Sequence, residues 1–244
     1  MTHRITPLLL AVFFASSLAA ESTPGVPDWA LPGSSTHRQV PPPAGFHRDT
    51  VTFDRPIGLF EGQSDIGGPF TSGSAWYNSG TGTYKIKAAG YNIWYFRDEF
   101  RFLWKKMSGD FRLAADITFE KPKGFDDRKV VLVVRQDLDD NAKEAMAALH
   151  ARGLIHLAVR PEKGADLKEA VHVDHQRNGH ERLGLVKDGD TFTLLVSLNG
   201  EPLHAAGSTT LHFDAPYYVG IGFTSHQPAN PDVALISHVE LTTK

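Results

Sequence analysis

The chain has 244 residues, a length that fits one β-sandwich domain or two smaller domains. Apolar residues make up 41% and charged residues 22% of the chain, so the composition excludes a disordered protein. The net charge of −3 and the lack of a dense Lys/Arg run argue against nucleic-acid binding. The lack of cysteine excludes disulfides, thiol nucleophiles and cysteine-ligated metals.

Residues 1–20 have the pattern of a secretory signal peptide. Arg4 precedes an apolar stretch at residues 8–15, and small residues follow up to Ala20. The apolar stretch is shorter than the roughly 20 residues that a membrane span needs. We therefore expect cleavage after Ala19 or Ala20 and no membrane span afterwards. An exported chain without cysteine fits a periplasmic or secreted protein.

Residues 21–48 are rich in Pro, Gly, Ser and Thr and have no hydrophobic periodicity. They predict an extended tether, with a leader packed along the domain edge as the alternative. From Val51 onward the pattern has a period of two residues. We therefore expect one β domain over residues 49–244.

The clearest strand pattern lies at residues 111–119, where Phe111, Leu113, Ile117 and Phe119 alternate with polar or small residues. This alternation predicts that all four side chains are buried on one face. Further strands are predicted at residues 100–104, 130–134, 155–159, 192–198, 217–224 and 233–241. Asp-Gly and Asn-Gly pairs within residues 187–190 and 198–201 predict two-residue hairpin turns.

Six stretches carry a family resemblance: residues 60–67, 90–104, 108–111, 133–140, 182–192 and 218–223. Together they resemble a bacterial family of concanavalin A-like sandwiches related to a domain of the yeast regulator of enolase. The first stretch, FEGQSDIG, is similar to an opening motif of exported TolB-like members. The resemblance implies an all-β, concanavalin A-like jelly-roll sandwich of two antiparallel sheets, one of them concave. Its superfamily includes lectins, glycan-binding modules and glycoside hydrolases, so a fold is implied rather than one activity.

Residues 142–150 give conflicting signals. Their composition favours a helix, with Asp139 and Asp140 before them and Gly153 as a stop. The resemblance implies a strand, and local propensity gives way to tertiary context. We therefore expect a strand.

Carboxylate pairs offer little support for hydrolysis. A retaining glycosidase needs two carboxylates about 5–5.5 Å apart, which on a strand means acids two or four residues apart. The glucanases of the resembling superfamily carry a Glu-x-Asp-x-Glu strand, and this sequence has none. Asp116 and Glu120 have the spacing, but no further acid supports them.

Two segments carry metal-ligating residue types. Asp137 and Asp139 match the start of a calcium loop, but Ala142 and Ala148 stand where the turn glycine and the bidentate glutamate belong. This excludes an EF-hand. A solvated acidic turn is favoured there over a looser calcium site at Asp137 and Asp139, and we expect no other cofactor. A second segment, which contains His172, His175 and His180, has no helical register, and surface histidines are favoured over a metal site.

The best candidate site is a sheet face. His156 and Arg160 share the side of one strand opposite its apolar residues, and a short turn brings His150 alongside. Neighbouring segments add Arg135, Trp94 and Asp98. We expect the concave sheet to present a ligand-binding face made of Arg135, His150, His156, Arg160, Trp94 and Asp98.

This face suits sugars, because aromatic rings stack on C–H surfaces and guanidinium groups pair with hydroxyls or carboxylates. Two cations and two imidazoles repel one another when charged, so we expect neutral histidines and a uronic acid or another anionic or polyhydroxylated ligand. The alternatives are that Trp94 belongs to the core and that the charged groups are solvated.

We therefore expect a secreted or periplasmic module that binds a carbohydrate or another extracytoplasmic ligand. One alternative is an enzyme that acts on a modified saccharide with His150 or His156 as general base. Another is a structural envelope module that docks to a partner through the tether.

Overall fold

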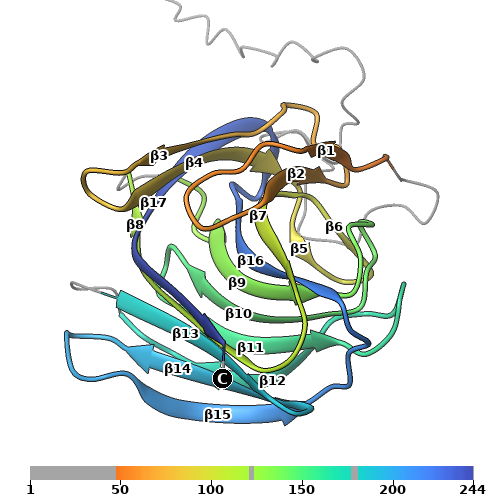
Figure 1. Cartoon of the computed structure of the whole chain (residues 1–244). Helices are drawn as coiled ribbons and strands as arrows, with labels where there is room; N and C mark the ends of the chain where they lie inside the picture. The colour runs from red at the N-terminus through yellow and green to blue at the C-terminus, as the bar shows by residue number, and fades with distance from the viewer. Residues whose placement is uncertain (1–47, 121–123, 177–180, 244) are drawn as a thin grey trace, which may run out of the picture.

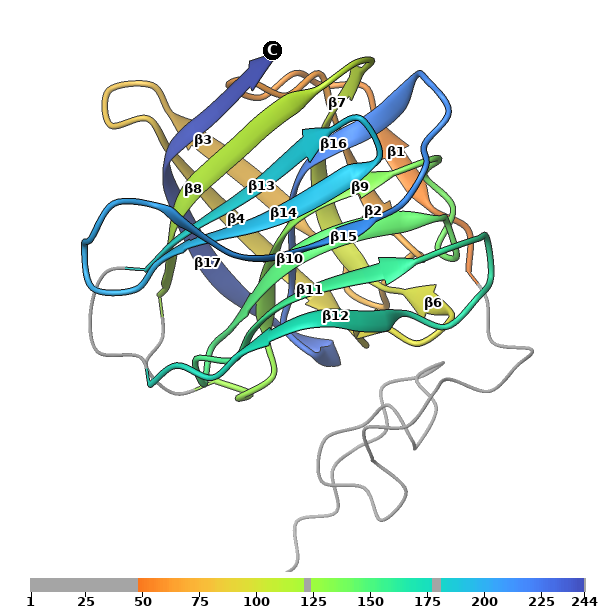
Figure 2. The same cartoon turned by 90° about the horizontal axis from the view of Figure 1, so that it is seen from below.

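The computed structural model describes residues 48–120, 124–176 and 181–243. Within these residues all strand pairings are antiparallel, and the strands form an eight-stranded sheet, a seven-stranded sheet and a two-stranded hairpin. The two large sheets stack as layers (Figures 1 and 2), which confirms the all-β sandwich prediction. The same residues include no helix that is long and apolar enough to cross a membrane. The predicted signal peptide and nearly all of the predicted tether lie outside them.

The eight-stranded sheet consists, in spatial order, of β1 (Val51–Phe53), β2 (Gly62–Ile66), β7 (Phe100–Met107), β16 (Tyr217–Thr224), β9 (Lys129–Arg135), β10 (Glu144–His150), β11 (Ile155–Arg160) and β12 (Lys168–Val173). The seven-stranded sheet consists of β15 (His204–Thr210), β14 (Thr191–Ser197), β13 (Glu181–Asp188), β8 (Phe111–Phe119), β17 (Gln227–Thr243), β4 (Thr83–Gly90) and β3 (Ser74–Asn78). The hairpin pairs β5 (Ile93–Trp94) with β6 (Arg97–Asp98).

The main core lies between the two large sheets. Phe111, Leu113, Ile117 and Phe119 of β8 are all buried in it, as their alternation predicts. The opposing layer contributes apolar side chains from β9, β10, β11 and β16. Removal of this apolar surface from water is the main favourable term that holds the layers together.

The segment with conflicting signals is the strand β10, all seven residues of which are buried. Ala145, Ala147 and Leu149 face the main core, whereas Met146 and Ala148 face a second apolar cluster on the other side of the sheet. A strand that is covered on both faces needs apolar residues on both, and here most of them are small. The alanine-rich composition that favours a helix in isolation therefore suits this strand.

The second cluster covers the face of the eight-stranded sheet that points away from the main core, here called the outer face. Phe100, Phe102 and Trp104 of β7 belong to this cluster, while Leu103 faces the main core. Gly222 on β16 allows the close packing, since a Cβ atom there would lie 2.5 Å from the ring of Phe100. The outer face is thus itself a buried surface over much of its area.

Of the two predicted two-residue turns, one is confirmed and the other is a longer loop. The turn at residues 187–190 closes the β13–β14 hairpin tightly, as predicted. The Asn-Gly pair within 198–201 lies in a longer loop, because the last pairing of β14 with β15 joins Val196 to His204. Glu201 stabilises this wider loop: its carboxylate accepts the backbone N–H groups of residues 198 and 199 at 2.6 and 2.8 Å.

Candidate functional site

The six residues predicted to form a ligand-binding face all lie on or over the outer face, and they separate into two groups. Asp98, Arg135 and Arg160 join Glu144 in a buried set of charges, here called the ionic cluster. Trp94, His150 and His156 line a cavity, here called the histidine cavity.

The register of three strands builds the ionic cluster. Glu144 on β10 lies opposite both Arg135 on β9 and Arg160 on β11, so one acid stands between two cations. Arg135 Nη1 donates to Glu144 Oε2, and Arg160 Nη1 lies 3.2 Å from Glu144 Oε1. All three side chains are fully buried.

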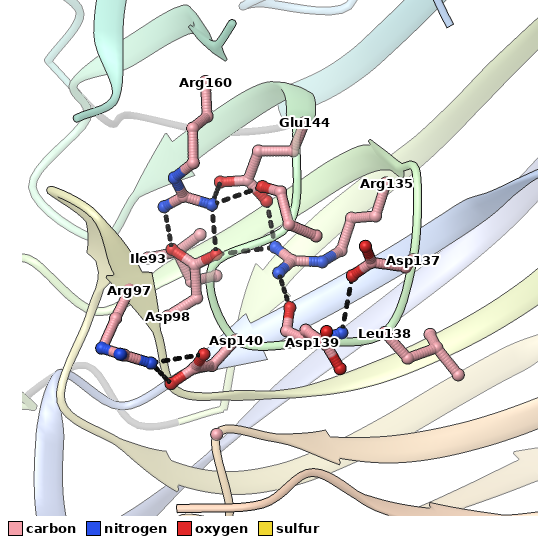
Figure 3. A network of polar contacts seen from close by, with 12 residues as sticks. Ile93, Arg97, Asp98, Arg135, Asp137, Leu138, Asp139, Asp140, Glu144 and Arg160 are labelled. Carbon is pink, nitrogen blue, oxygen red and sulfur yellow. Dashed lines mark hydrogen bonds and ion pairs between the residues drawn. The ribbon is translucent and has the colours of Figure 1, made fainter. Parts of the chain in front are cut away.

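Asp98 completes the cluster from the β5–β6 hairpin (Figure 3). Arg160 donates to its carboxylate through two hydrogen bonds of 2.8 Å, and Arg135 donates to Oδ2 at 2.7 Å. The two guanidinium groups and the two carboxylates balance in charge, which buried ions require. Burial alone would lower the pKa of Arg160, but Asp98 and Glu144 raise this pKa above its ordinary value.

From the sequence we expected Arg135, Arg160 and Asp98 to be accessible to a ligand. This expectation is wrong, because the three side chains are buried against one another. The physical reason is the counter-charge. Asp98 and Glu144 come from other strands, so the alternation of a single strand does not reveal that the arginines are already paired. Burial raises the pKa of Glu144, while the neighbouring Arg135 opposes the shift.

The ionic cluster holds the β5–β6 hairpin against the sheet, and the hairpin in turn presents Trp94. At the tip of the hairpin, Arg160 donates to the carbonyl oxygen of Tyr95 at 3.1 Å. At its start, Lys129 Nζ donates to Asn92 Oδ1 at 2.8 Å. Trp94 is half-buried, so it is neither a fully buried core residue nor a fully exposed surface residue.

The histidine cavity has a volume of about 170 Å³. The rings of His150 and His156 meet edge-on, with their centroids 5.1 Å apart. The centroid of the Trp94 ring lies 5.2 Å from that of His156. The side chains that line the cavity are aromatic, imidazole, amide, aliphatic and charged: Asn92, Trp94, Tyr95, Asp127, Lys129, His150, Arg152, Leu154, His156, Glu169 and His226.

His150 and His156 are buried, and none of their four ring nitrogens has a hydrogen-bond partner among the described residues. Nδ1 of His150 lies 3.5 Å from Asp127 Oδ1, and Nδ1 of His156 lies 3.7 Å from Glu169 Oε2, which is too long for good hydrogen bonds. A buried polar group without a partner costs about 1–3 kcal/mol. Two such groups beside one cavity suit a ligand that supplies the missing partners.

The electrostatics keep both imidazoles neutral at pH 7. Burial, together with Lys129, lowers the pKa of His150 from 6.5 to about 4. The same two causes lower the pKa of His156 well below 6.5. Burial also lowers the pKa of Lys129 itself, to about 8. These directions agree with the expectation that the histidines are neutral.

Several lining residues were not predicted from the sequence. For Glu144 of the ionic cluster a signal existed, because the turn after His150 sets the register of β10 and β11 and places Glu144 opposite Arg160. Lys129 lies opposite His150 through the pairing of β9 with β10, which that turn does not set. Asp127 and His226 come from segments between strands, where no periodic pattern indicates a facing direction.

The predicted histidine segment lines a second cavity, of about 350 Å³, that shares part of its lining with the histidine cavity. His172 lies 3.1 Å from Asp174 and 2.9 Å from Glu169, and these hydrogen bonds raise its pKa. His175 is 3.8 Å from the carboxylate of Glu181, and His180 lies outside the described residues. Among the residues that the structure covers, no group of three or more His, Cys, Asp or Glu side chains is arranged to hold a metal.

The acidic turn proposed as a weak calcium site holds a lysine. Lys163 Nζ lies 3.2 Å from Asp137 Oδ2 and also contacts Asp139 Oδ2. The backbone N–H of Asp139 donates to Asp137 Oδ1 at 2.9 Å (Figure 3). An ammonium group of the chain therefore already stands between the two carboxylates.

No known protein family and no curated protein matches this sequence. Solved structures share its fold. A functionally unknown protein from Saccharomyces cerevisiae is 13% identical with a TM-score of 0.55, over 80% of this chain and 96% of that protein. The carbohydrate-binding module CBM66 from Bacillus subtilis is 14% identical with a TM-score of 0.50, over 70% and 92%.

A third similar structure is GH43B of the Bacteroides ovatus xyloglucan PUL, which is 14% identical with a TM-score of 0.54. The match covers 87% of this chain but only 42% of that protein, so this chain corresponds to less than half of it. At these identities the similarity establishes the fold. The predicted concanavalin A-like jelly-roll sandwich is confirmed.

Proposed function

We propose that this protein binds a carbohydrate in the histidine cavity, on the sheet face that we expect to be concave. The observation that carries the proposal is the pair of buried, unpartnered imidazoles beside the half-buried Trp94. A sugar supplies both things that such a cavity lacks. Its hydroxyls donate and accept hydrogen bonds, and its C–H faces stack on an aromatic ring.

The comparisons support a carbohydrate ligand in general terms. One of the proteins with this fold is a carbohydrate-binding module, and another is a GH43 protein of a xyloglucan PUL. Because a fold hosts many functions, this support is weaker than that of the cavity itself.

We also propose that the protein is exported and acts in the periplasm or outside the cell. Support comes from the signal-peptide pattern of residues 1–20 and from the resemblance to exported concanavalin A-like proteins related to the regulator of enolase. The test is the intact mass of the protein after expression in a bacterium. We expect a chain that starts at Ala20 or Glu21, and a purified chain that retains residues 1–19 would contradict export by cleavage.

Glycan binding is tested by a glycan array with the purified protein, followed by calorimetry on the glycans that bind. His156→Phe keeps a planar aromatic ring and removes both ring nitrogens, so we expect affinity to fall about tenfold or more. His212→Phe is the matched control, because His212 is exposed and pairs with Asp190 elsewhere on the surface. An array on which no glycan binds would favour a structural envelope module. An equal loss of affinity in both variants would show that the sugar does not bind in the histidine cavity.

A second candidate function is enzymatic, and one contact favours it. Asp127 lies beside Nδ1 of His150 and can orient this imidazole, which leaves Nε2 to take a proton. The neutral state of His150 at pH 7 suits a general base. Incubation of array-positive glycans with the protein, followed by mass spectrometry, distinguishes the two functions: new products that His150→Gln abolishes would identify an enzyme.

A further inference from the structure

The ring nitrogens of His150 and His156 define what the bound group must offer. A neutral imidazole has one N–H donor and one bare acceptor nitrogen, so the pair presents two donors and two acceptors. None of these four atoms is satisfied by the part of the chain that the structure describes, and both rings are buried. The complementary group must therefore donate and accept in equal number.

The charged groups around the cavity are already engaged. Lys129 Nζ donates to the side chain of Asn92 and to a backbone carbonyl. Arg152 Nε lies 3.2 Å from Asp127 Oδ1. Glu169 holds His172 at 2.9 Å. A ligand thus meets the ion-paired Arg152, the Lys129 ammonium held by two neutral acceptors, two carboxylates and two neutral imidazoles.

We propose that the histidine cavity recognises adjacent hydroxyl groups of a neutral sugar and discriminates against the corresponding uronic acid. This inference rests on the proposed carbohydrate-binding function and specifies its ligand class. It differs from the expectation drawn from the sequence, which included an anionic sugar because both arginines were expected to face the ligand. The structure places those arginines in the ionic cluster instead.

Two adjacent hydroxyls fit the pair of imidazoles by number and by type. Each hydroxyl has one donor and an acceptor oxygen, so the two together match two N–H groups and two bare nitrogens. The ring centroids of the histidines are 5.1 Å apart, which allows one small group to contact both.

A carboxylate fails on the same count. Placed against the two imidazoles, it only accepts hydrogen bonds and leaves the two bare nitrogens unsatisfied. A uronate that presents its hydroxyls to the imidazoles instead still brings a negative charge near Asp127 and Glu169. Both cations that line the cavity in the described part of the chain are already engaged, because Arg152 pairs with Asp127 and Lys129 donates to Asn92 and to the carbonyl of Ile93.

Calorimetry at pH 7 tests the inference with matched probes. Methyl glycosides of glucose, galactose, mannose, xylose and fructose are titrated into the full-length protein, beside glucuronate, galacturonate and mannuronate. We expect a neutral sugar to bind at least about tenfold more tightly than its uronate. We also expect a deoxy analogue that lacks one of two adjacent hydroxyls to lose about tenfold in affinity.

Each outcome has a separate meaning. A uronate that binds as tightly as its neutral partner, or more tightly, overturns the specificity and leaves carbohydrate binding intact. If no sugar of either series binds, the proposed function fails as well.

A measurement on the unmutated protein avoids reliance on variants that fold poorly. In nitrogen NMR of histidine-labelled protein, the binding sugar should shift the ring nitrogens of His150 and His156 and leave those of His212 unchanged. Binding without a shift at either buried histidine would place the sugar elsewhere and overturn the inference.

Discussion

The two ends of strands β9, β10 and β11 carry buried polar side chains in opposite states. At one end, the members of the ionic cluster face opposite charges at 3.2 Å or less. At the other end, His150 and His156 are also buried but have no hydrogen-bond partner within the described chain. Burial therefore does not distinguish the proposed binding site from a structural element on this sheet. The presence or absence of partners does.

The largest effect is expected when one partner is removed from the ionic cluster. Arg135→Ala leaves Asp98 and Glu144 buried with too little positive charge, so we expect the free energy of unfolding to fall by about 3–5 kcal/mol. Urea unfolding of both proteins measures the change.

The control is Arg112→Ala, which removes an exposed arginine from β8 and should change stability by about 0.5 kcal/mol or less. A cost of less than about 1 kcal/mol for Arg135→Ala would show that the cluster does not hold the hairpin.

The pH dependence of stability tests the other end of the strands. His150 has a folded pKa of about 4 against 6.5 when unfolded, so the unfolded chain binds its proton first as the pH falls. The contribution of neutral His150 to the free energy of unfolding is therefore fully present above pH 6.5, and it is lost as the pH falls from 6.5 to about 4. At about 1.4 kcal/mol per pH unit, the loss is about 3 kcal/mol in total.

His150→Gln isolates this contribution from that of Glu144, whose raised pKa acts in the opposite direction in both proteins. The difference between the two urea-unfolding profiles should therefore rise with pH between 4 and 6.5 and stay flat above. Asp127, Lys129 and Arg152 face the same imidazole and remain in both proteins. A flat difference over the whole range would contradict burial of a neutral His150.

The contrast also explains how much of the fold the sequence predicts. The two-residue alternation at Phe111, Leu113, Ile117 and Phe119 identifies a core strand because one face of that strand is buried throughout and the other face carries polar residues, two of them exposed. Strand β10 is buried on both faces and gives no such alternation, so its composition alone favours a helix. The resemblance to a sandwich family, rather than local propensity, identified it as a strand.

For the site, the sequence predicts which side chains share a face but not what covers that face. Parity places His156 and Arg160 together on the side opposite the apolar residues of β11. It does not reveal that Asp98 reaches Arg160 from a segment 62 residues away, or that the hairpin then closes over the sheet. The pairing of Asp98 with Arg135 and Arg160, which are distant in the sequence, therefore makes this half of the predicted face part of the buried ionic cluster.

His156→Phe sharpens the comparison from the side of stability. The substitution removes two unsatisfied nitrogens and keeps a planar aromatic ring, whose larger size the adjacent cavity can accommodate, so we expect a change of about 1 kcal/mol or less in the free energy of unfolding. Affinity for the sugar should nevertheless fall. A loss of more than about 3 kcal/mol in urea melts would mean that His156 has structural partners like those of the ionic cluster.

The acidic turn is an intermediate case, in which charges are paired but exposed. Lys163 and Asp139 have 49% and 61% of their side chains exposed, so water screens the contact. We expect Lys163→Met to change the free energy of unfolding by less than about 1 kcal/mol. We also expect calcium to leave the melting temperature of the unmutated protein unchanged, because the ammonium group already occupies the space between Asp137 and Asp139. In the Lys163→Met protein the two carboxylates lose that cation, and calcium should raise the melting temperature slightly. A larger rise in the unmutated protein would show that calcium displaces Lys163, and the turn would then be a metal site after all.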